Sequence, residues 1–289
     1  MGSSRRVRVA GIIGYPLKHS LSPVFQQAAF DFYGMPVRYE AWETPHENLA
    51  QVVGGLRDDS CVGANVTMPY KEAVVPYLDD VDADAAEIGA VNTIVNREGK
   101  LLGFNTDAEG FARSLAEAGY TGADKTVAVL GAGGAARAVG VSLLRMGANS
   151  ITFVNRDRSR AQRLVDDLSR LSGDCVLAIG DHDRVTLGGL LPRCDVIVNA
   201  TTVGMKHGQV PDRSPLPADL IPSDALVVDL VYNPPLTRLL AEASERGARV
   251  VNGVSMLVYQ GAASFELWTG KRAPVGLMLE RVLEALRKA

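Results

Sequence analysis

The feature of this sequence that most constrains its fold is a short apolar run that leads directly into a cluster of glycines. Residues Thr126–Leu130 read Thr-Val-Ala-Val-Leu, and the chain continues as Gly131-Ala-Gly133-Gly134-Ala before a long amphipathic segment. The β-branched run predicts a strand, and the segment after the glycines predicts a helix. A strand, a glycine turn and a helix in this order are typical of a dinucleotide-binding unit.

Each small residue of this turn has a physical role in binding a pyrophosphate. Gly131 permits the tight turn, Gly133 lets the backbone approach the pyrophosphate, and Ala136 lets the helix pack closely against the strand. Gly134 and Ala135 stand at the predicted helix start, where unpaired N–H groups and the positive end of the helix dipole favour an anion. The alternative is an ordinary glycine-rich turn, and the regular pattern on both sides favours the nucleotide site.

The middle of the chain alternates short β-branched runs with longer amphipathic segments. This rhythm predicts a doubly wound, Rossmann-like α/β domain with a parallel sheet and right-handed crossovers. The predicted strands are Thr126–Leu130, Ile151–Val154, Val176–Ala178, Val196–Asn199 and Leu226–Leu230. The predicted helices include Ala135–Met146, Arg158–Leu171 and Thr237–Arg246.

The first hundred residues alternate less regularly and predict a second, mixed α/β domain. The expected strands are Val7–Ile13, Val37–Trp42, Gly63–Thr67 and two runs within Ile88–Phe104 that are joined by the turn-forming residues 96–99. The helical segments Ser255–Trp268 and Val275–Arg287 are too short to hold a core alone, so we expect them to return to the first domain. The expected boundaries are residues 1–107, 108–249 and 250–289.

Composition favours a small-molecule partner. The chain has 289 residues, 47% of them hydrophobic, which can fill two cores. Its net charge of −3 creates no field that would draw it onto nucleic acid or an anionic membrane. No apolar run reaches the roughly 20 residues that span a bilayer, and the basic start Met1–Val9 lacks the apolar core of a signal peptide. Three cysteines without close spacing (Cys61, Cys175 and Cys194) are expected to be reduced and mostly buried, which points to the cytoplasm.

The end of the second predicted strand of the nucleotide domain bears on the choice of cofactor. NAD-binding domains carry an acidic residue about 20 residues past the glycine turn, where it holds the ribose hydroxyls. Here the chain reads Asn155-Arg156-Asp157-Arg158-Ser-Arg160. Arg156, with Arg158 or Arg160, would give a 2′-phosphate a bidentate cationic partner, which favours NADP. Asp157 would suit a ribose hydroxyl, which keeps NAD open, and a solvated arginine face of a helix is the structural alternative.

Polar residues stand near the start of the first predicted helix of the other domain. Ser22 precedes Pro23 and is predicted as the N-cap of the helix Pro23–Tyr33. That structural role does not explain Ser20, whose hydroxyl would lie beside the same helix start, where a carboxylate binds well.

A second polar group follows the later strands of this domain. Asn65 and Thr67 share one face of a predicted strand by the two-residue period. Lys71 is predicted to open the next helix, where a lysine opposes the helix dipole, so its charge suits an anionic or carbonyl ligand. Asn92 and Asp107 stand at the ends of the two hairpin strands, which brings an amide and a carboxylate together, although Asp107 alone would be explained by capping the helix Ala108–Ala118.

At these residues the chain resembles the shikimate dehydrogenase family, in order and across nearly its whole length. The matching segments are Gly14-Tyr-Pro16, His19-Ser-Leu-Ser-Pro23, Asn65-Val-Thr-Met-Pro-Tyr-Lys71, Gly89-Ala-Val-Asn-Thr93, Gly103-Phe-Asn-Thr-Asp107, Gly131-Ala-Gly-Gly-Ala135, Asn155-Arg156, Tyr232-Asn-Pro234, and Asn252-Gly253 through Gln260. The resemblance implies two domains that face each other across a cleft, and NADP-dependent reduction of 3-dehydroshikimate to shikimate in chorismate and aromatic amino acid biosynthesis.

The resemblance also implies a role for each matching residue. Ser20 and Ser22 match carboxylate-binding serines, and Tyr232 matches a residue close to the substrate. The positions that hold the ring hydroxyls are Asn65, Thr67, Asn92, Asp107 and Gln260. Lys71 and Asp107 match the catalytic pair. The cofactor positions are Gly131, Gly133, Gly134, Ala135, Asn155, Arg156, Arg160, Thr201, Met205 and Gly253, of which the last three fall near the nicotinamide pocket.

The implied chemistry is coherent, because reduction of a ring ketone needs a hydride on carbon and a proton on the developing alkoxide. The nicotinamide supplies the hydride. Lys71 can donate the proton, and Asp107 can position it and stabilise its charge. No metal is expected, since His19, His46, His182 and His207 lack ligand spacing.

Two alternatives stay open at this point. Asp157 departs from the hydroxyl residue common in NADP-specific members, which keeps an NAD-dependent quinate/shikimate dehydrogenase in view. A non-catalytic metabolite sensor on the same fold would not need Lys71 and Asp107. The sequence does not distinguish a monomer from a homodimer.

Overall fold

The chain divides into two units, each with its own sheet. The computed structural model describes residues 7–288, so the first six residues of the basic start lie outside the described residues. Unit 1 comprises Met1–Gly110 together with Val258–Ala289, and unit 2 comprises Phe111–Leu257. The division passes through helices α4 (Asp107–Glu117) and α9 (Val254–Thr269).

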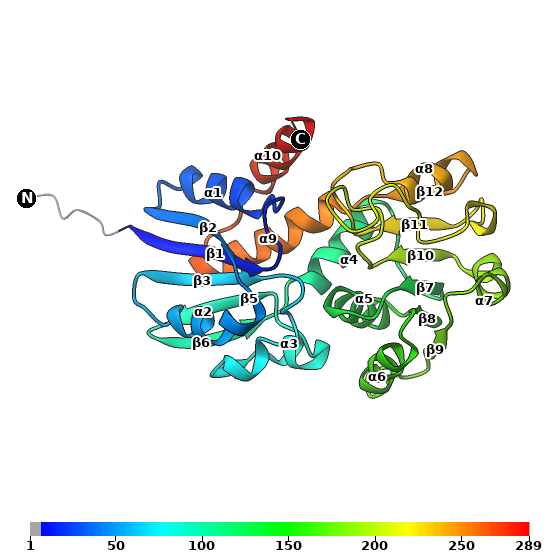
Figure 1. Cartoon of the computed structure of the whole chain (residues 1–289), viewed down its shortest axis with the longest axis horizontal. Helices are drawn as coiled ribbons and strands as arrows, with labels where there is room; N and C mark the ends of the chain where they lie inside the picture. Colours follow the sequence, from blue (N-terminus) through cyan, green and yellow to red (C-terminus); the bar gives the residue numbers. More distant parts are fainter. Residues whose placement is uncertain (1–6, 289) are drawn as a thin grey trace, which may run out of the picture. The chain divides into compact units, whose positions relative to one another are not determined.

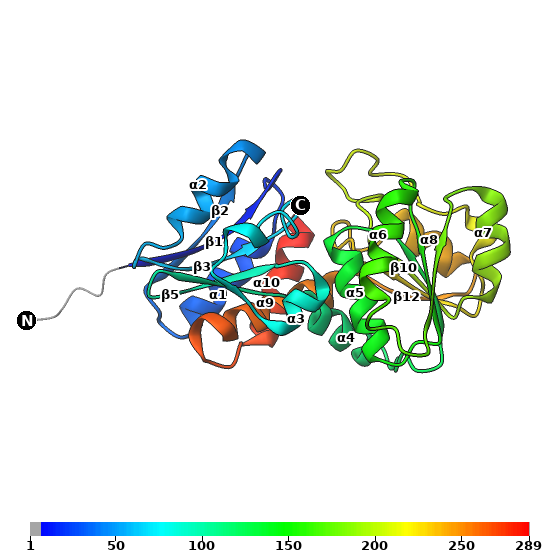
Figure 2. The ribbon, with the colours of Figure 1, turned by 90° about the horizontal axis from the view of Figure 1, so that it is seen from below.

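Unit 2 is built on a parallel sheet. Within the described residues its strand order is β12-β11-β10-β7-β8-β9, with every neighbouring pair parallel. The strands are β7 (Thr126–Leu130), β8 (Ser150–Val154), β9 (Val176–Gly180), β10 (Val196–Asn199), β11 (Leu226–Asp229) and β12 (Arg249–Val251). The main helices are α5 (Gly134–Arg145), α6 (Arg158–Leu168), α7 (Arg184–Leu190) and α8 (Arg238–Glu245). The predicted doubly wound domain is confirmed, because α5 and α6 lie on one face of the sheet and α7 and α8 on the other (Figure 2).

Helices on both faces explain why the central strands of unit 2 are apolar throughout. All four residues of β10 and of β11 are buried. On one face, Leu187 of α7 and Leu240 of α8 belong to the same buried cluster as Ile197 and Val227 of the sheet. Strands covered on both faces lose the alternation of polar and apolar residues, as observed here.

Unit 1 contains a mixed sheet with the order β2-β1-β3-β5-β6-β4 within the described residues. The strands are β1 (Arg8–Gly14), β2 (Val37–Glu43), β3 (Cys61–Val66), β4 (Asp80–Val81), β5 (Thr93–Arg97) and β6 (Lys100–Phe104). β1 is parallel to β2 and β3, whereas β5 is antiparallel to β3 and β6. The predicted hairpin is therefore present, with Glu98 and Gly99 at positive φ in its turn. Its first strand begins at Thr93 rather than near Ile88, because Ile88 ends helix α3 (Ala83–Ile88) and Gly89 follows in the left-handed conformation.

The C-terminal part of α9 packs onto the first helix of unit 1. In Figure 1 this part of the chain, coloured orange, lies close to α1 (Ser22–Phe32). The rings of Phe30 and Phe265 have centroids 5.2 Å apart. Trp268 donates from Nε1 to the carbonyl of Ile94 at 2.9 Å, and Gln26 donates to the carbonyl of Gly261 at 2.8 Å. The next helix, α10 (Val275–Lys288), also packs against α1, while α2 (Leu49–Gly55) lies on the other face of the sheet (Figure 2).

Gly261 allows this close approach, and Gly261→Ala is expected to destabilise the protein. A Cβ at position 261 would lie 2.3 Å from Cε2 of Phe25, which is fully buried. Alanine gains about 1 kcal/mol over glycine in a helix, but overpacking typically costs about 1–3 kcal/mol. Because the rigid ring of Phe25 would have to move, we place the overpacking cost at the upper end of this range. We therefore expect a net loss of about 1–2 kcal/mol in the free energy of unfolding, measured by urea denaturation.

Gly276 in α10 is the matched control. A Cβ at that position would meet nothing within 4 Å. Gly276→Ala is therefore expected to leave stability unchanged or to raise it slightly. Equal stability of Gly261→Ala and the wild type would show that α9 can shift away from α1 at no cost.

Candidate functional site

The centre of the candidate site in unit 1 is an ion pair between Lys71 and Asp107. Lys71 lies in a turn after β3, and Asp107 is the first residue of α4, which follows β6. The Lys71 Nζ atom is 2.6 Å from Asp107 Oδ2, and the two side chains are only 17% and 4% exposed. An ammonium group has three N–H donors, and this bond uses one of them.

Asn92 holds the other side of the Asp107 carboxylate. Its Nδ2 atom lies 2.9 Å from Asp107 Oδ1 and 3.3 Å from Gln260 Oε1. Its Oδ1 atom accepts from the backbone N–H of Thr106 at 2.9 Å. Thr93 pairs with Phe104 across the hairpin, so Asn92 and Asp107 meet at the same end of β5 and β6. The carboxylate is thus fixed through both oxygens, and the ammonium group is fixed by the carboxylate.

Behind this pair lies a buried hydroxyl and amide cluster centred on Ser264 of α9. The Ser264 hydroxyl is 2.9 Å from Asn65 Nδ2, 2.7 Å from Thr93 Oγ1 and 3.3 Å from Thr106 Oγ1. The Oδ1 atom of Asn65 accepts from the Tyr39 hydroxyl at 2.7 Å. Both ends of the Asn65 amide therefore bind protein groups, which makes Asn65 a support for the site in this structure.

Ser264 was not predicted as part of this cluster, and Thr93 and Thr106, which end the two predicted hairpin strands, were given no individual role. All three side chains are at most 4% exposed. The one sequence signal for Ser264 is its position one helical turn after Gln260, and its carbonyl partner is indeed Gln260 at 3.0 Å. Nothing in the sequence indicates that this turn of α9 meets β3 and β5.

Two local predictions about unit 1 are wrong. The N-cap of α1 is Leu21 rather than Ser22, and Ser22 is the first helical residue. Its N–H donates to the Ser20 hydroxyl at 3.3 Å, so Ser20 is the residue that binds the helix start. Lys71 opens no α-helix, because the turn that contains it leads only to a short 3-10 helix at Val75–Tyr77. Lys71 therefore does not face the dipole of an α-helix that begins at its own position.

Thr67 and the two serines occupy the ends of neighbouring elements of unit 1. Thr67 directly follows β3, and its N–H donates to the carbonyl of Ile13 in β1 at 2.8 Å. A Cβ on Gly14, the last residue of β1, would lie 2.4 Å from Thr67 Cγ2. Ser20 is half-buried and Ser22 is 5% exposed.

The glycine turn of unit 2 has the geometry that a pyrophosphate requires. Gly131 has a φ of +110°, and a Cβ there would lie 3.1 Å from the carbonyl oxygen of Ala200. Gly133 is the N-cap of α5, with an extended backbone and no side-chain hydrogen bond to the helix start. Gly134 and Ala135 form the first turn, whose N–H groups are left for an anion.

One arginine after β8 lies beside this turn. A Cβ on Gly133 would lie 3.4 Å from Nη2 of Arg160, so that guanidinium stands beside the turn. Asn155 donates to the carbonyl of Asp157 at 2.8 Å, and Arg156 is exposed. These donors fit a phosphorylated dinucleotide, because guanidinium and backbone N–H groups are the usual partners of phosphate.

Asp157 has a structural role in this segment. Its Oδ1 atom accepts from the Ser159 hydroxyl at 2.7 Å and from the N–H of Arg160 at 3.1 Å, which makes it the N-cap of α6. The Ser159 hydroxyl and the Arg160 N–H hold the pKa of the Asp157 carboxyl below its usual value. One of its oxygens is therefore committed to the helix start.

The remaining predicted cofactor residues, and the predicted substrate residue Tyr232, lie in loops after parallel strands of unit 2. Thr201 and Met205 follow β10, Tyr232 follows β11, and Gly253 follows β12. A Cβ on Gly253 would lie 2.2 Å from the carbonyl oxygen of Leu230, so only glycine fits there. Carboxyl ends of parallel strands are where doubly wound folds bind their ligands.

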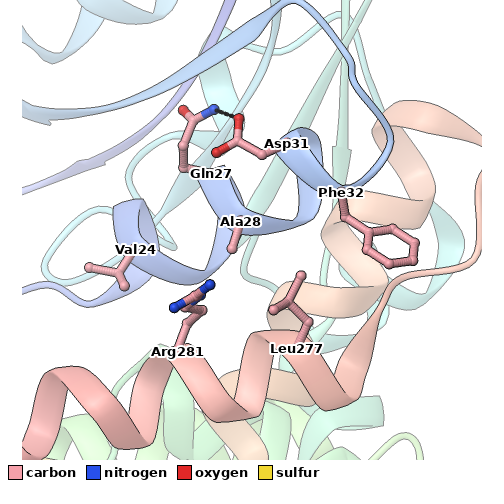
Figure 3. Close-up of a pocket in the computed structure, with 7 residues that line it drawn as sticks. All are labelled: Val24, Gln27, Ala28, Asp31, Phe32, Leu277 and Arg281. Atoms are coloured by element: carbon pink, nitrogen blue, oxygen red, sulfur yellow. Dashed lines mark hydrogen bonds between the residues drawn. The ribbon is translucent and has the colours of Figure 1, made fainter.

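Two hollows lie elsewhere on the described part of unit 1. Between α1 and α10, Val24, Gln27, Asp31, Phe32 and Arg281 line a groove of about 330 Å³, and no predicted site residue lines it (Figure 3). The other hollow has a volume of about 420 Å³ and lies beside Asn105 and Thr106. Its lining includes Asp82, Asp84, Glu109 and Glu266, whose negative charges would repel a ligand that carries a carboxylate.

Residues 7–288 contain neither a cluster of metal ligands nor a helix suited to a membrane. No group of three or more histidine, cysteine or acidic residues in that part of the chain is placed to hold a metal ion. No helix there has the length and apolar content to cross a bilayer. The three cysteines are free, as predicted, and burial raises the pKa of Cys61 and Cys194 to about 11.

The doubly wound unit 2, with its glycine turn, and the buried lysine–carboxylate pair of unit 1 together define an oxidoreductase of the dinucleotide-binding class. Three family models match the chain. They are the shikimate dehydrogenase substrate binding domain at residues 12–94, shikimate / quinate 5-dehydrogenase at 114–207, and the shikimate 5′-dehydrogenase C-terminal domain at 253–283. The chain belongs to the shikimate dehydrogenase family.

Individual relatives match along almost the whole chain. The shikimate dehydrogenase (NADP(+)) of Methanopyrus kandleri is 50% identical over 282 residues, which cover 96% of each chain. The shikimate 5-dehydrogenase of Thermus thermophilus, solved with NADP(H) and shikimate, is 39% identical with a TM-score of 0.85, covering 96% of this chain and 100% of that one. The quinate dehydrogenase of Corynebacterium glutamicum, solved with NAD, is 30% identical with a TM-score of 0.86, covering 96% and 99%.

Proposed function

We propose that this chain catalyses the reversible, NADP-dependent reduction of 3-dehydroshikimate to shikimate, a step of chorismate and aromatic amino acid biosynthesis. The observation that carries the proposal is the buried 2.6 Å pair between Lys71 and Asp107. It is found in a chain that is 50% identical to a shikimate dehydrogenase (NADP(+)) over nearly its full length. A metabolite sensor has no need for a buried proton donor.

Lys71 and Asp107 form the proposed catalytic pair. NADPH, when bound, supplies the hydride. Lys71 donates a proton to the alkoxide oxygen that develops from the ring ketone, and it takes the proton back in the direction of shikimate oxidation. Its positive charge also stabilises that oxygen in the transition state. Asp107 holds Nζ in place, and Asn92 holds Asp107.

The proposed substrate-binding residues are grouped by the part of the substrate that each would bind. Ser20 and Ser22, at the start of α1, are proposed to bind the carboxylate. The proposed ring-hydroxyl partners are Asn65, Thr67, Asn92, Asp107 and Gln260, and Tyr232 is proposed to lie close to the substrate. Asn65 is also proposed to hold the cluster that orients Asn92, because both ends of its amide bind protein groups in this structure.

The cofactor is proposed to be NADP. Gly131, Gly133, Gly134 and Ala135 would bind the pyrophosphate. Asn155, Arg156 and Arg160 would bind the adenosine end with its 2′-phosphate, and Thr201, Met205 and Gly253 would line the nicotinamide end. Support comes from the role of Asp157 as the α6 N-cap, which occupies an oxygen that a ribose hydroxyl would otherwise use.

Arg156→Ala tests the 2′-phosphate contact. Loss of a charge-assisted hydrogen bond costs about 1.5–3 kcal/mol, so we expect KM for NADP to rise at least about tenfold while KM for NAD changes less than about twofold. Steady-state kinetics with both cofactors measure the two values. Arg163→Ala, on the exposed face of the helix α6 that follows Arg156, is the control and is expected to change neither. Equal increases for NADP and NAD would remove Arg156 from 2′-phosphate recognition.

Steady-state rates with shikimate and quinate, each with NADP and NAD, test the function as a whole. We expect the highest kcat/KM for shikimate with NADP. A large excess of NAD-linked over NADP-linked efficiency would favour the quinate/shikimate alternative, which the NAD-bound quinate dehydrogenase relative keeps relevant. Binding of shikimate without turnover under any condition would favour the sensor.

Three further assignments belong to the proposal. Residues 1–107 are proposed as the substrate domain and 108–249 as the NADP domain, with 250–289 returning to the former. A cytoplasmic location is proposed from the free cysteines. A small-molecule substrate is the proposed partner of either a monomer or a homodimer.

A further inference from the structure

Unit 2 contains a buried carboxylate to which the reaction scheme gives no role. Asp229 is the last residue of β11 and is fully buried. Its Oδ1 atom accepts from Asn199 Nδ2 at 2.9 Å and from the N–H of Val231 at 3.0 Å, and its Oδ2 atom accepts from the Thr237 hydroxyl at 2.6 Å. These three donors, found among the described residues, are all uncharged.

A carboxylate in this environment is costly. Burial raises the pKa of Asp229 to about 6, while the hydrogen bonds from Thr237, Val231 and Asn199 oppose the rise. At neutral pH the group is therefore still mostly ionised. Burial of an ion without an opposite charge reduces stability, so stability alone does not explain an aspartate here.

What the charge provides is a fixed orientation of the Asn199 amide. A carboxylate can only accept hydrogen bonds, so the NH2 group of Asn199 must face Asp229. The same NH2 group also donates to the carbonyl of Val203 at 3.2 Å. The Oδ1 atom of Asn199 is consequently turned toward Thr201, from which it accepts two bonds, 3.1 Å from the N–H and 2.6 Å from the hydroxyl.

The result is a defined position for Thr201 and for the loop after β10. The Thr201 hydroxyl donates to Asn199 and accepts from the N–H of Val203 at 3.2 Å, so its own direction is set. Lys206 joins this loop to the loop after β11, because its N–H donates to the carbonyl of Asn233 at 2.8 Å. Asp229 thus lies where the loops that carry Thr201, Met205 and Tyr232 begin.

We propose that Asp229 is a positioning residue for the dehydrogenase reaction, and that it acts through Asn199 to hold Thr201 where the nicotinamide end of the dinucleotide binds. The expected effect on kcat rests on the proposed function, whereas the expected effect on dinucleotide binding does not. Asp229 is fully buried and is proposed to act only through Asn199, so its effect should be confined to the nicotinamide end. The adenosine end, at the glycine turn and Arg156, should not respond.

The test compares Asp229→Asn, Asn199→Ala and the double variant in the full chain. Two binding constants are measured for each protein: Kd for NADP, and Kd for 2′,5′-ADP, which contains only the adenosine end. We expect each single variant to lower kcat about tenfold, since small misplacement of bound groups has effects of this size or larger. We also expect NADP binding to weaken at least threefold while Kd for 2′,5′-ADP stays within twofold. The double variant should be no worse than the poorer single one, because both changes interrupt one chain of contacts.

Val127→Ala controls for a general loss of stability. Val127 is fully buried in β7 near the opposite end of the sheet and has no part in the Asp229 contacts. Its variant should lower the melting temperature and leave kcat and the ratio of the two Kd values unchanged. The inference is overturned by a normal kcat in folded Asp229→Asn, by equal weakening of NADP and 2′,5′-ADP, or by strictly additive effects in the double variant.

The outcomes also separate this inference from the proposed function. If the wild type binds NADP but reduces none of it with shikimate, the proposed function fails. The ratio of the two Kd values still decides the role of Asp229 in that case. Should Asp229→Asn not fold, Asn199→Ala alone tests the same contact, with the same expected values.

Discussion

Lys71→Ala is expected to lower kcat at least about hundredfold, the usual scale for a positioned general acid, while the protein still binds shikimate. The reason is that the ammonium group acts on an oxygen that becomes negative only as hydride arrives, so its removal affects the transition state more than the bound substrate. Steady-state kinetics give kcat, and isothermal titration with shikimate gives the affinity.

Lys125 provides the control for this prediction. It is also paired with an aspartate, Asp195, but at 3.5 Å and with both side chains about 40% exposed, at 38% and 42%. Lys125→Ala should keep kcat within about twofold, because exposed pairs contribute little. Near-normal turnover in Lys71→Ala would remove Lys71 from the mechanism.

Asp107→Ala is expected to reduce kcat to a similar extent, at least about hundredfold, because Nζ of Lys71 loses the group that fixes it. This variant should also be less stable, since removal of one partner from a buried pair typically costs about 3–5 kcal/mol. The Lys71 side chain is only 17% exposed, so solvent cannot easily replace the carboxylate that it loses. Urea denaturation measures the second effect separately from kinetics.

Comparison of Asp107→Asn and the double variant Lys71→Ala/Asp107→Ala separates the two effects. Asparagine keeps the shape and the contact with Asn92, so a folded Asp107→Asn with low kcat would assign the loss to the missing charge. The double variant should be no slower than the poorer single variant, because residues that act as a unit have non-additive effects. Multiplicative losses would mean that Asp107 has a role separate from Lys71.

The parts of the structure that depend on local sequence could be predicted. Strand β7 has the predicted bounds, and α5 begins one residue before the predicted start. Both follow from a β-branched run and a glycine turn, which act over a few residues. The hairpin of β5 and β6 could be predicted for the same reason, because Glu98 and Gly99 form its turn.

The parts that depend on tertiary contacts could not be predicted. β12 has only three residues, and it is recognised as a strand because β11 offers it a partner. Ser264 is an ordinary helical serine in sequence, and its role depends on how α9 packs against β3 and β5. The pattern around Lys71 resembled a helix start, but the carbonyl of Lys71 accepts from the N–H of Val91 at 2.7 Å. That long-range bond draws the chain into a turn.

The capping role of Asp157 has a consequence for how cofactor preference changes in evolution. Serine, threonine, asparagine and aspartate all serve well at an N-cap. In the proposed cofactor site, a substitution at position 157 would therefore change the charge near the adenosine end while the start of α6 stays intact. We expect such a substitution to shift the balance between the two nicotinamide dinucleotides without a compensating mutation elsewhere, so that cofactor choice would diverge faster than the scaffold that carries it.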